Sequence, residues 1–287
     1  MDAMIHTLNP SIAGGGIEEG AAIAARHGFQ GIELPLGAAH ALAARDGVAA
    51  VADIYKSHNL VTPVFGLEVE WRKDEDTFLR GLAELPAAAK TAAALGANRC
   101  CTWVLPDGGV PLAEYRANSI RRFAKVAKIL NDNGILLGLE FIGPRHFRTS
   151  PDNVWFWDIA SGLQGADDVA AASGTDNVGL LVDCFHWFNS EGNAMDLASI
   201  PVEQVVHVHI NDAPAVPLDE QVDNVRFLPG DKGTIDITAF LKTLAAIGYE
   251  GPVATEVLGT ALDGLTPDEK AAATIDSEIK CFALAGV

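Results

Sequence analysis

Apolar and polar positions along this 287-residue chain follow two alternating spacings. Short, nearly continuous runs of Val, Ile, Leu and Ala are typical of strands that are buried on both faces of a parallel sheet. Longer stretches with apolar residues three and four positions apart are typical of amphipathic helices. The two patterns follow one another through the whole sequence, so strands and helices are predicted to alternate.

The strand-like runs number eight, and helix-like segments separate them. Strands are predicted at 4–8, 31–34, 61–69, 99–105, 135–142, 178–183, 205–210 and 252–257. Helical segments are predicted at 17–27, 48–58, 77–95, 112–133, within 152–173, and at 194–199, 236–247 and 267–284. Four glycines stand where a helix must stop, a position that favours the left-handed conformation; they are Gly28, Gly96, Gly134 and Gly248.

Eight such units without a linker-like tract predict a single (β/α)₈ TIM barrel domain over residues 1–287. The alternative is a doubly wound open sheet, which is also built from alternating strands and helices. The turn after the first strand, residues 9–16, contains three glycines but no G-x-G-x-x-G motif. Its sequence therefore favours the barrel.

Composition narrows the class of protein. The chain is 49% hydrophobic, and its net charge of −18 disfavours nucleic acids and anionic membranes as partners. The amino terminus lacks the pattern of a signal peptide, and no run of about 18 apolar residues is present. The cysteines lie in apolar or mixed segments, which predicts buried free thiols and a reducing, cytoplasmic location; they are Cys100, Cys101, Cys184 and Cys281.

Four consecutive predicted strands carry a potential metal ligand at or near their carboxyl ends. These side chains are Glu140, Asp183, His209 and Glu256. In a barrel of parallel strands the carboxyl ends converge on one mouth, where catalytic groups collect. Two Glu, one Asp and one His form a hard, mostly oxygen site that suits a divalent cation.

Each of these side chains also has an ordinary explanation when it is considered alone. Glu140 could lie at an exposed strand edge or pair with Arg145 or Arg148. The other three could be a helix cap, a hydrogen-bonded core histidine and an interior ion pair, respectively. Because all four occupy equivalent points of consecutive strands, a shared metal site is the stronger hypothesis.

Other residues are weaker candidates for the same mouth. Period-two alternation places His207 on the same face as His209, so only one of them need be a ligand. Glu33 and Glu68 end earlier predicted strands and could face the mouth. Trp103 lies near a strand end, where it could stack on a sugar ring or simply pack.

At this point the chain resembles the xylose isomerase-like barrel superfamily. The resemblance rests on the segments LEFIGP, VDCFH, HVHIND and TEV, and on the loop PGDKGTID at 229–236. That superfamily includes sugar phosphate isomerases/epimerases, ketose 3-epimerases, inosose dehydratases and endonuclease IV relatives. The resemblance covers most of the chain and is specific for the fold and the metal site.

The resemblance implies roles for individual residues. It implies that Glu140, Asp183, His209 and Glu256 are the metal ligands and that His186 contacts a substrate oxygen. It also implies that Arg226 holds another substrate oxygen or an anionic group. Two departures from ketose 3-epimerases, at 145–148 and 213–215, disfavour a strict free-ketose 3-epimerase, because the acidic residue and the arginine of those enzymes are missing there.

The predicted function is a metal-dependent isomerase or epimerase of a small carbohydrate or sugar phosphate. Glu140 and Glu256 would take and return a proton through an enediolate, and His186 would polarise an oxygen. The expected ion is Mn²⁺, with Mg²⁺, Co²⁺ and Zn²⁺ as alternatives. A homo-oligomer is compatible with the sequence.

Three other functions remain open. A dehydratase of inosose or dehydroshikimate type uses similar chemistry and then expels a hydroxyl group. An endonuclease IV-like nuclease would need more metal ligands and a basic groove, and a non-catalytic sugar-binding barrel would not need a complete ligand set. No lysine lies in a predicted strand, which disfavours a Schiff-base aldolase.

Overall fold

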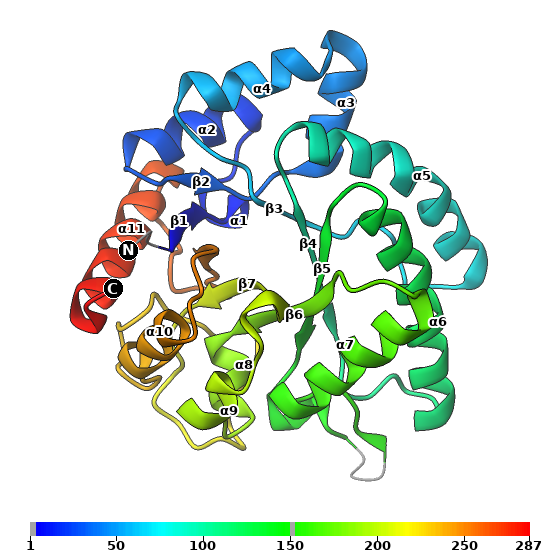
Figure 1. The fold of residues 1–287 in the computed structure, drawn as a ribbon. Coiled ribbons are helices and arrows are strands. Elements are labelled where there is room, and N and C mark those ends of the chain that lie inside the picture. The colour runs from blue at the N-terminus through cyan, green and yellow to red at the C-terminus, as the bar shows by residue number, and fades with distance from the viewer. Residues whose placement is uncertain (1–3, 150–152) are drawn as a thin grey trace.

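The computed structural model describes residues 4–149 and 153–287, and these residues form a barrel of parallel strands (Figure 1). The described part contains eight strands: β1 (Ile5–Leu8), β2 (Gly31–Ile32), β3 (Val64–Gly66), β4 (Arg99–Val104), β5 (Leu136–Phe141), β6 (Val178–Asp183), β7 (Val205–Ile210) and β8 (Pro252–Thr255). They are ordered β2-β1-β8-β7-β6-β5-β4-β3, and an isolated parallel bridge between Gly31 and Val61 links the two ends of this order. The predicted (β/α)₈ barrel is therefore confirmed, and the open doubly wound sheet is excluded.

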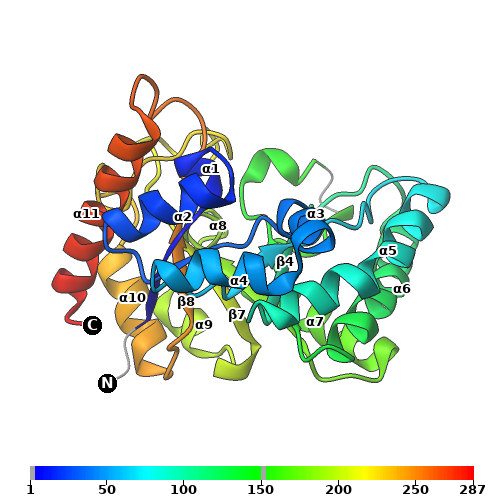
Figure 2. The same ribbon diagram turned by 90° about the horizontal axis from the view of Figure 1, so that it is seen from above.

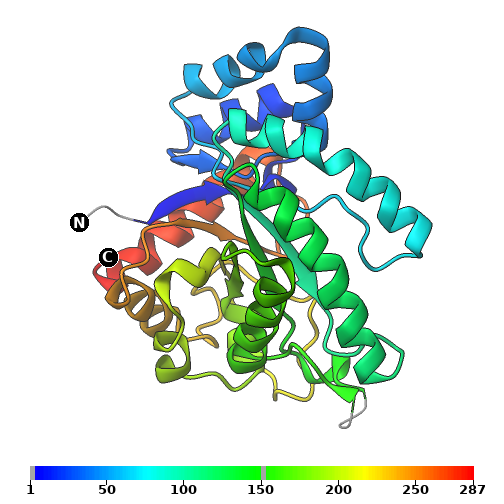
Figure 3. The same ribbon diagram turned by 45° about the vertical axis from the view of Figure 1, so that its right-hand side comes forward.

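Helices surround the strands. They are α1 (Pro10–Ala13), α2 (Ile17–Arg26), α3 (Leu36–Asp46), α4 (Val48–Ser57), α5 (Glu75–Ala94), α6 (Leu112–Asn131), α7 (Ile159–Ser173), α8 (Cys184–Asn189), α9 (Ala194–Ala198), α10 (Ile237–Ala246) and α11 (Pro267–Ala285), with short 3₁₀ turns η1 (Arg145–Phe147) and η3 (Val202–Gln204). Figure 2 shows α2, α3 and α4 together on one side. The last helix, α11, packs against α1, α2 and β1, so the first and last elements of the described residues lie side by side (Figure 3).

The predicted elements differ from the observed ones mainly near the amino terminus and after β6. Helices α1, α3 and α8 were not predicted, and β3 is shorter than the extended segment expected at 61–69. The predicted helix-ending glycines all have positive φ, between 67° and 86°. The Asp236 carboxylate accepts a hydrogen bond from the Ala239 amide at 2.9 Å, as expected of a helix cap.

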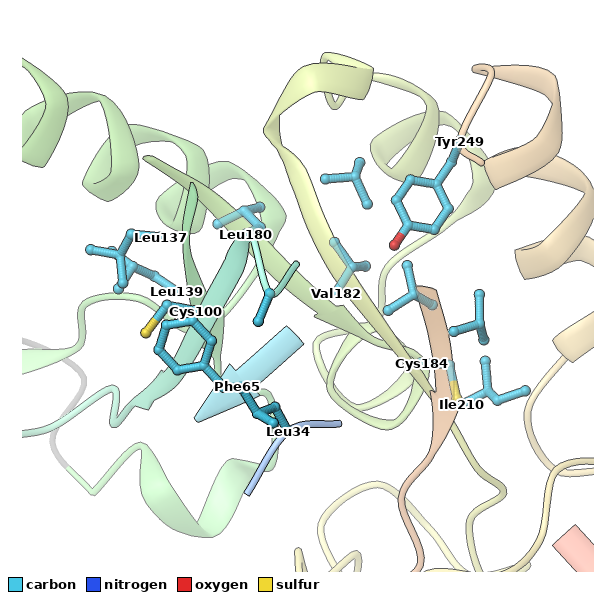
Figure 4. Packing of buried hydrophobic residues seen from close by; sticks show 14 of the residues in the cluster. Leu34, Phe65, Cys100, Leu137, Leu139, Leu180, Val182, Cys184, Ile210 and Tyr249 are labelled. Carbon is cyan, nitrogen blue, oxygen red and sulfur yellow. The ribbon is translucent and has the colours of Figure 1, made fainter. Parts of the chain in front are cut away.

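Apolar side chains form two layers because successive residues of a strand point to opposite faces. The larger layer lies between the strands and the helices and includes Leu137, Leu139, Leu180 and Val182 (Figure 4). A small cluster of Val64, Cys101, Leu181 and Val206 fills the barrel interior. All four cysteines are buried and free, as predicted. No helix in the described residues is long and apolar enough to cross a bilayer.

A register irregularity between β6 and β7 helps to set the height of the polar side chains. Leu180 pairs with Val205, whereas Leu181 pairs with His207, so Val206 is an extra residue on β7. After this bulge, Asp183 pairs with His209. Bulges of this kind redirect side chains near functional sites. Here the irregularity brings the Asp183 and His209 backbones side by side at the barrel mouth.

Gly138 provides a test of how tightly the barrel interior is packed. A Cβ atom at this position would lie 2.8 Å from Cys101 Sγ and 3.0 Å from Val206 Cβ. We expect Gly138→Ala to lower the free energy of unfolding by about 1–3 kcal/mol because of overpacking. Gly66→Ala, in β3, is the matched control, because its Cβ would meet no atom within 4 Å. Chemical denaturation measures both, and equal stability of the two variants would contradict the expectation.

Candidate functional site

The four predicted metal ligands come together at the carboxyl ends of β5 to β8. Glu140 lies within β5, Asp183 ends β6, His209 is the penultimate residue of β7 and Glu256 directly follows β8. Each offers one ligand atom, and these atoms all lie within 4.8 Å of one another. The parallel pairing of adjacent strands thus converts four distant sequence positions into one compact cluster.

Glu140 is a buried carboxylate, 7% exposed, and its Oε1 atom has no hydrogen-bond partner. The arginines that could have paired with it lie elsewhere. Arg145 pairs with Glu191 at 2.6 Å, and the Arg148 guanidinium lies over the Trp157 ring. Burial, together with the negative charges of Glu256 and Asp183, raises the pKa of Glu140 well above its usual value.

Asp183 serves two purposes with its two oxygens. Oδ1 accepts the Phe185 amide at 2.6 Å and so caps α8, while Oδ2 accepts Arg226 Nη1 at 2.8 Å. The Asn211 side chain donates to both oxygens, at 3.1 and 3.3 Å. The capping explanation for Asp183 is therefore correct, and it is compatible with a place in the cluster. Burial raises its pKa despite the opposing charge of Arg226.

The His209 ring connects the cluster to a second carboxylate. Its Nδ1 atom has no hydrogen-bond partner and lies 3.9 Å from Asp183 Oδ2 and 3.8 Å from Glu256 Oε2. Its Nε2 atom lies 3.4 Å from Glu33 Oε1. Burial lowers the pKa of His209, but Glu256, Glu33 and Glu140 outweigh this effect and raise it to about 10. With this raised pKa, the His209 ring of the metal-free protein is positively charged at neutral pH.

Arg226 is the principal cation at this mouth and is 2% exposed. Its Nη1 atom donates to Asp183 Oδ2 at 2.8 Å and to Glu256 Oε2 at 2.5 Å, and its Nη2 atom donates to Asp223 Oδ1 at 2.6 Å. The guanidinium also lies over the Phe185 ring, 4.7 Å from its centroid. The acidic side chains of the site thus fix the position of the guanidinium. The sequence alone did not indicate these contacts.

His186 lies on α8 against the loop that follows β5. The Gly143 amide donates to His186 Nδ1 at 3.4 Å, and a Cβ on Gly143 would lie 2.2 Å from the His186 carbonyl oxygen. The glycine thus allows the helix to approach. His186 Nε2 lies 3.7 Å from both Glu140 Oε1 and Asp223 Oδ1. Burial and the charges of Arg226 and His209 hold the pKa of His186 well below its usual value, so the ring is neutral.

A cavity of about 360 Å³ opens beside these groups. Its polar lining consists of Glu140, His186, Asp223, Arg226 and Glu256, and its other lining residues are Trp103, Leu105, Ile142, Phe147 and Leu258. Trp103 is 40% exposed, and the Arg72 guanidinium stacks on its ring at 3.8 Å. Polar groups are therefore gathered at the metal-ligand cluster, and the rest of the lining is largely apolar.

Two acidic residues of the site had little or no signal in the sequence. Asp223, which binds Arg226 and faces His186, lies outside every predicted strand and motif. Asp212 follows β7, and its carboxylate accepts the backbone amides of residues 232–235, which fixes the 229–236 loop beside the mouth. Its place in the segment HVHIND could have suggested a structural role. Glu68 instead accepts the Gly37 amide, away from the cluster.

The cluster has the donors and the charge of a divalent cation site. Three carboxylates and one imidazole converge, and two of their buried atoms, Glu140 Oε1 and His209 Nδ1, lack any partner. Buried polar atoms without partners are costly and call for an explanation. Arg226 compensates part of the negative charge but leaves these two atoms unpaired. A divalent ion fits this set of oxygen and nitrogen donors.

Comparison with known proteins agrees with the architecture. A solved structure of a xylose isomerase domain protein from Alicyclobacillus acidocaldarius has 34% sequence identity and a TM-score of 0.87, and the match covers 99% of this chain and 100% of that one. An inosose isomerase from Bacillus velezensis is 25% identical over 224 residues, 77% of this chain and 76% of the relative.

A shorter similarity involves a lyase. A 3-dehydroshikimate dehydratase from Pseudomonas aeruginosa is 32% identical over 143 residues, which is 49% of this chain but 20% of the relative.

The family model described as xylose isomerase-like TIM barrel matches residues 21–281, nearly the whole chain. The strand order, the clustered side chains and this match together show that the chain belongs to the xylose isomerase-like TIM barrel family.

Proposed function

We propose that this protein is a divalent-metal-dependent isomerase or epimerase of a small polyhydroxylated carbonyl compound. The observation that carries the proposal is the cluster of Glu140, Asp183, His209 and Glu256, with its two unpartnered buried atoms, beside a cavity. The inosose isomerase relative supports the reaction class. When bound, the divalent ion would supply positive charge that stabilises the negative charge developing on the substrate oxygens. Mn²⁺ is the first choice, followed by Mg²⁺, Co²⁺ and Zn²⁺.

The proton transfers fall to the two glutamates. Glu140 comes from β5 and Glu256 from the end of β8, so the two carboxylates enter the cavity from different strands, which are separated in the sheet by β6 and β7. One takes a proton from the carbon next to the carbonyl and the other returns it. His186 lies between two donors: the Gly143 amide is 3.4 Å from Nδ1, and Arg226 Nη2 is 3.3 Å from Nε2. Because the ring also lines the cavity, we assign it to the binding and polarisation of a substrate oxygen.

The charge of the cavity favours an unphosphorylated substrate. Arg226 is the one lysine or arginine that lines the cavity within the described residues, and its guanidinium is already bound by Asp183, Asp223 and Glu256. A phosphate group needs free cationic donors. A keto-inositol or another compact neutral polyol fits better than a sugar phosphate, because apolar residues form much of the remaining wall.

Elimination of water is the second candidate reaction. It is favoured by the 32% identity with a 3-dehydroshikimate dehydratase over about half of this chain. Both reactions begin with proton abstraction next to a carbonyl, so Glu140 and Glu256 serve either one. The products separate the two candidates, since only the dehydratase releases water and an unsaturated compound.

Variants of the two glutamates test the proposed function. With keto-inositols and ketoses in D₂O, the metal-loaded protein is expected to incorporate deuterium at one carbon next to the carbonyl, as NMR would show. Glu140→Gln and Glu256→Gln are each expected to reduce turnover at least about 100-fold, the usual weight of acid–base catalysis. Glu84→Gln, on an exposed position of α5, is the control and should retain turnover.

Metal content must be measured in the same variants, because a lost ligand and a lost proton carrier both abolish turnover. Deuterium exchange that survives in one variant with metal retained assigns the base to the other glutamate. Absence of turnover with every neutral ketose and keto-inositol, alongside turnover of a phosphorylated one, contradicts the substrate assignment. An unsaturated product selects the dehydratase.

Metal binding is expected to depend on pH. The pKa of His209 is about 10 in the metal-free protein, and the pKa of Glu140 is well above its usual value, so both must lose protons when an ion binds. The apparent affinity for Mn²⁺ should therefore rise by about tenfold or more per pH unit between roughly pH 6 and 9. Calorimetry in buffers of different ionisation enthalpy should show at least about one proton released per ion. An affinity independent of pH would contradict this.

A further inference from the structure

Glu33 is a carboxylate outside the four-residue cluster that nevertheless contacts it. It lies directly after β2, and its Oε1 atom is 3.1 Å from His207 Nε2 and 3.4 Å from His209 Nε2. One oxygen thus meets two histidines of β7. Both contacts are made by a carboxylate oxygen, which can only accept hydrogen bonds.

His207 holds Glu33 in place. The ring is 1% exposed, and its Nδ1 atom lies 3.1 Å from the carbonyl oxygen of Pro252, at the start of β8. The Pro252 carbonyl oxygen and the Glu33 carboxylate oxygen both only accept, so the ring satisfies both when each of its nitrogens carries a proton, and its orientation is fixed between them. The His207 and His209 rings meet edge to face, with centroids 4.8 Å apart. Glu33 is therefore anchored on one histidine while it reaches the other.

The consequence for His209 is a defined tautomer. A carboxylate at Nε2 requires a proton on that nitrogen, which leaves the lone pair of a neutral ring on Nδ1. Nδ1 is the nitrogen that lies near Asp183 and Glu256 and that has no other partner. Carboxylates that bind the distal nitrogen of a ligating histidine fix its tautomer and orientation and increase its basicity.

We propose that Glu33 is the positioning residue of the metal site: it holds His209 with Nε2 protonated and Nδ1 directed toward the ion. This inference rests on the metal site of the proposed function. Glu33 would touch neither ion nor substrate, and it acts through His209. The sequence suggested that Glu33 could face the mouth but indicated no partner for it. The structure shows two partners, His207 and His209.

The same atoms offer a competing explanation. Glu33 Oε1, His207 Nε2 and His209 Nε2 also lie within 4.8 Å of one another, so they could hold a second ion. His209 would then have to bind one ion through each nitrogen, which requires the loss of both ring protons. A neutral histidine supplies a lone pair at one nitrogen only. The observations therefore favour a single ion with Glu33 as a hydrogen-bond acceptor.

The test compares Glu33→Ala and Glu33→Gln with the wild-type protein. Glu33→Ala should weaken Mn²⁺ binding by roughly 10–100-fold, the usual cost of losing such an outer carboxylate. Glu33→Gln keeps an oxygen acceptor of similar shape and should lose less. Glu70→Gln, an exposed glutamate of the β3–α5 loop, is the control and should bind like the wild type. Chelator competition gives the dissociation constants, and thermal unfolding of the metal-free proteins shows whether each variant folds.

Nitrogen NMR of the histidine rings provides a readout that a general structural defect would not produce. In the Zn²⁺-loaded wild type, His209 should have its proton on Nε2 and its metal-bonded nitrogen at Nδ1. In Zn²⁺-loaded Glu33→Ala, the preference for this tautomer should weaken.

The possible results separate the two proposals. Unchanged Mn²⁺ affinity and an unchanged tautomer in both variants overturn the role of Glu33 while leaving the metal site intact. Two ions per wild-type chain, with one lost in Glu33→Ala, make Glu33 a ligand and also overturn the inference. Failure of the wild type to bind Mn²⁺ or Zn²⁺ overturns the proposed function itself, together with the role of Glu33. If Glu33→Ala does not fold, Glu33→Gln and the wild-type tautomer still decide the question.

Discussion

The balance of charge at the barrel mouth is the constraint on which the rest of this site depends. Three mutually close carboxylates come from β5, β6 and the end of β8, and a fourth, Asp223, lies beside them. Carboxylates this close cannot all remain ionised without cations. Arg226 compensates Asp183, Glu256 and Asp223, but Glu140 Oε1 lies beyond its hydrogen bonds and stays without a partner. This buried oxygen without a partner is what makes the mouth suitable for a divalent ion.

The backbone places these charges with little freedom. Consecutive parallel strands from β5 to β8 are hydrogen-bonded neighbours, and the extra residue at Val206 sets Asp183 opposite His209. Gly143 allows α8 to approach β5, so that His186 reaches the same mouth. Functional groups on rigid strands are held more accurately than groups on loops. Asp212 extends this order to the 229–236 loop by accepting its backbone amides.

The sequence predicted the barrel and the convergence of four side chains because both follow from local patterns. Buried strands have a distinctive composition, and in a parallel barrel their ends must meet. The sequence did not predict α3 or α8, because neither segment has a strong helical periodicity of apolar residues. It also did not predict the partners of Glu33, Asp223 and Arg226. Most of those contacts join residues far apart in the sequence, 176 positions for Glu33 and His209, and they depend on side-chain packing that the local sequence pattern does not reveal. Glu140 could be separated from Arg145 and Arg148 only once the structure showed where these arginines lie.

The pairing between neighbouring strands is not equally extensive around the barrel. β4 to β8 pair over several residues each, whereas β2 meets the chain before β3 through the isolated bridge between Gly31 and Val61. The four clustered residues Glu140, Asp183, His209 and Glu256 lie on the continuous part of the barrel, and the weakly paired part lies beside Glu33. Sequence drift along this weakly paired part could reshape one wall of the mouth while the proton carriers keep their spacing. Proteins with this barrel would therefore change the substrates that their cavities accept sooner than the type of reaction that they catalyse.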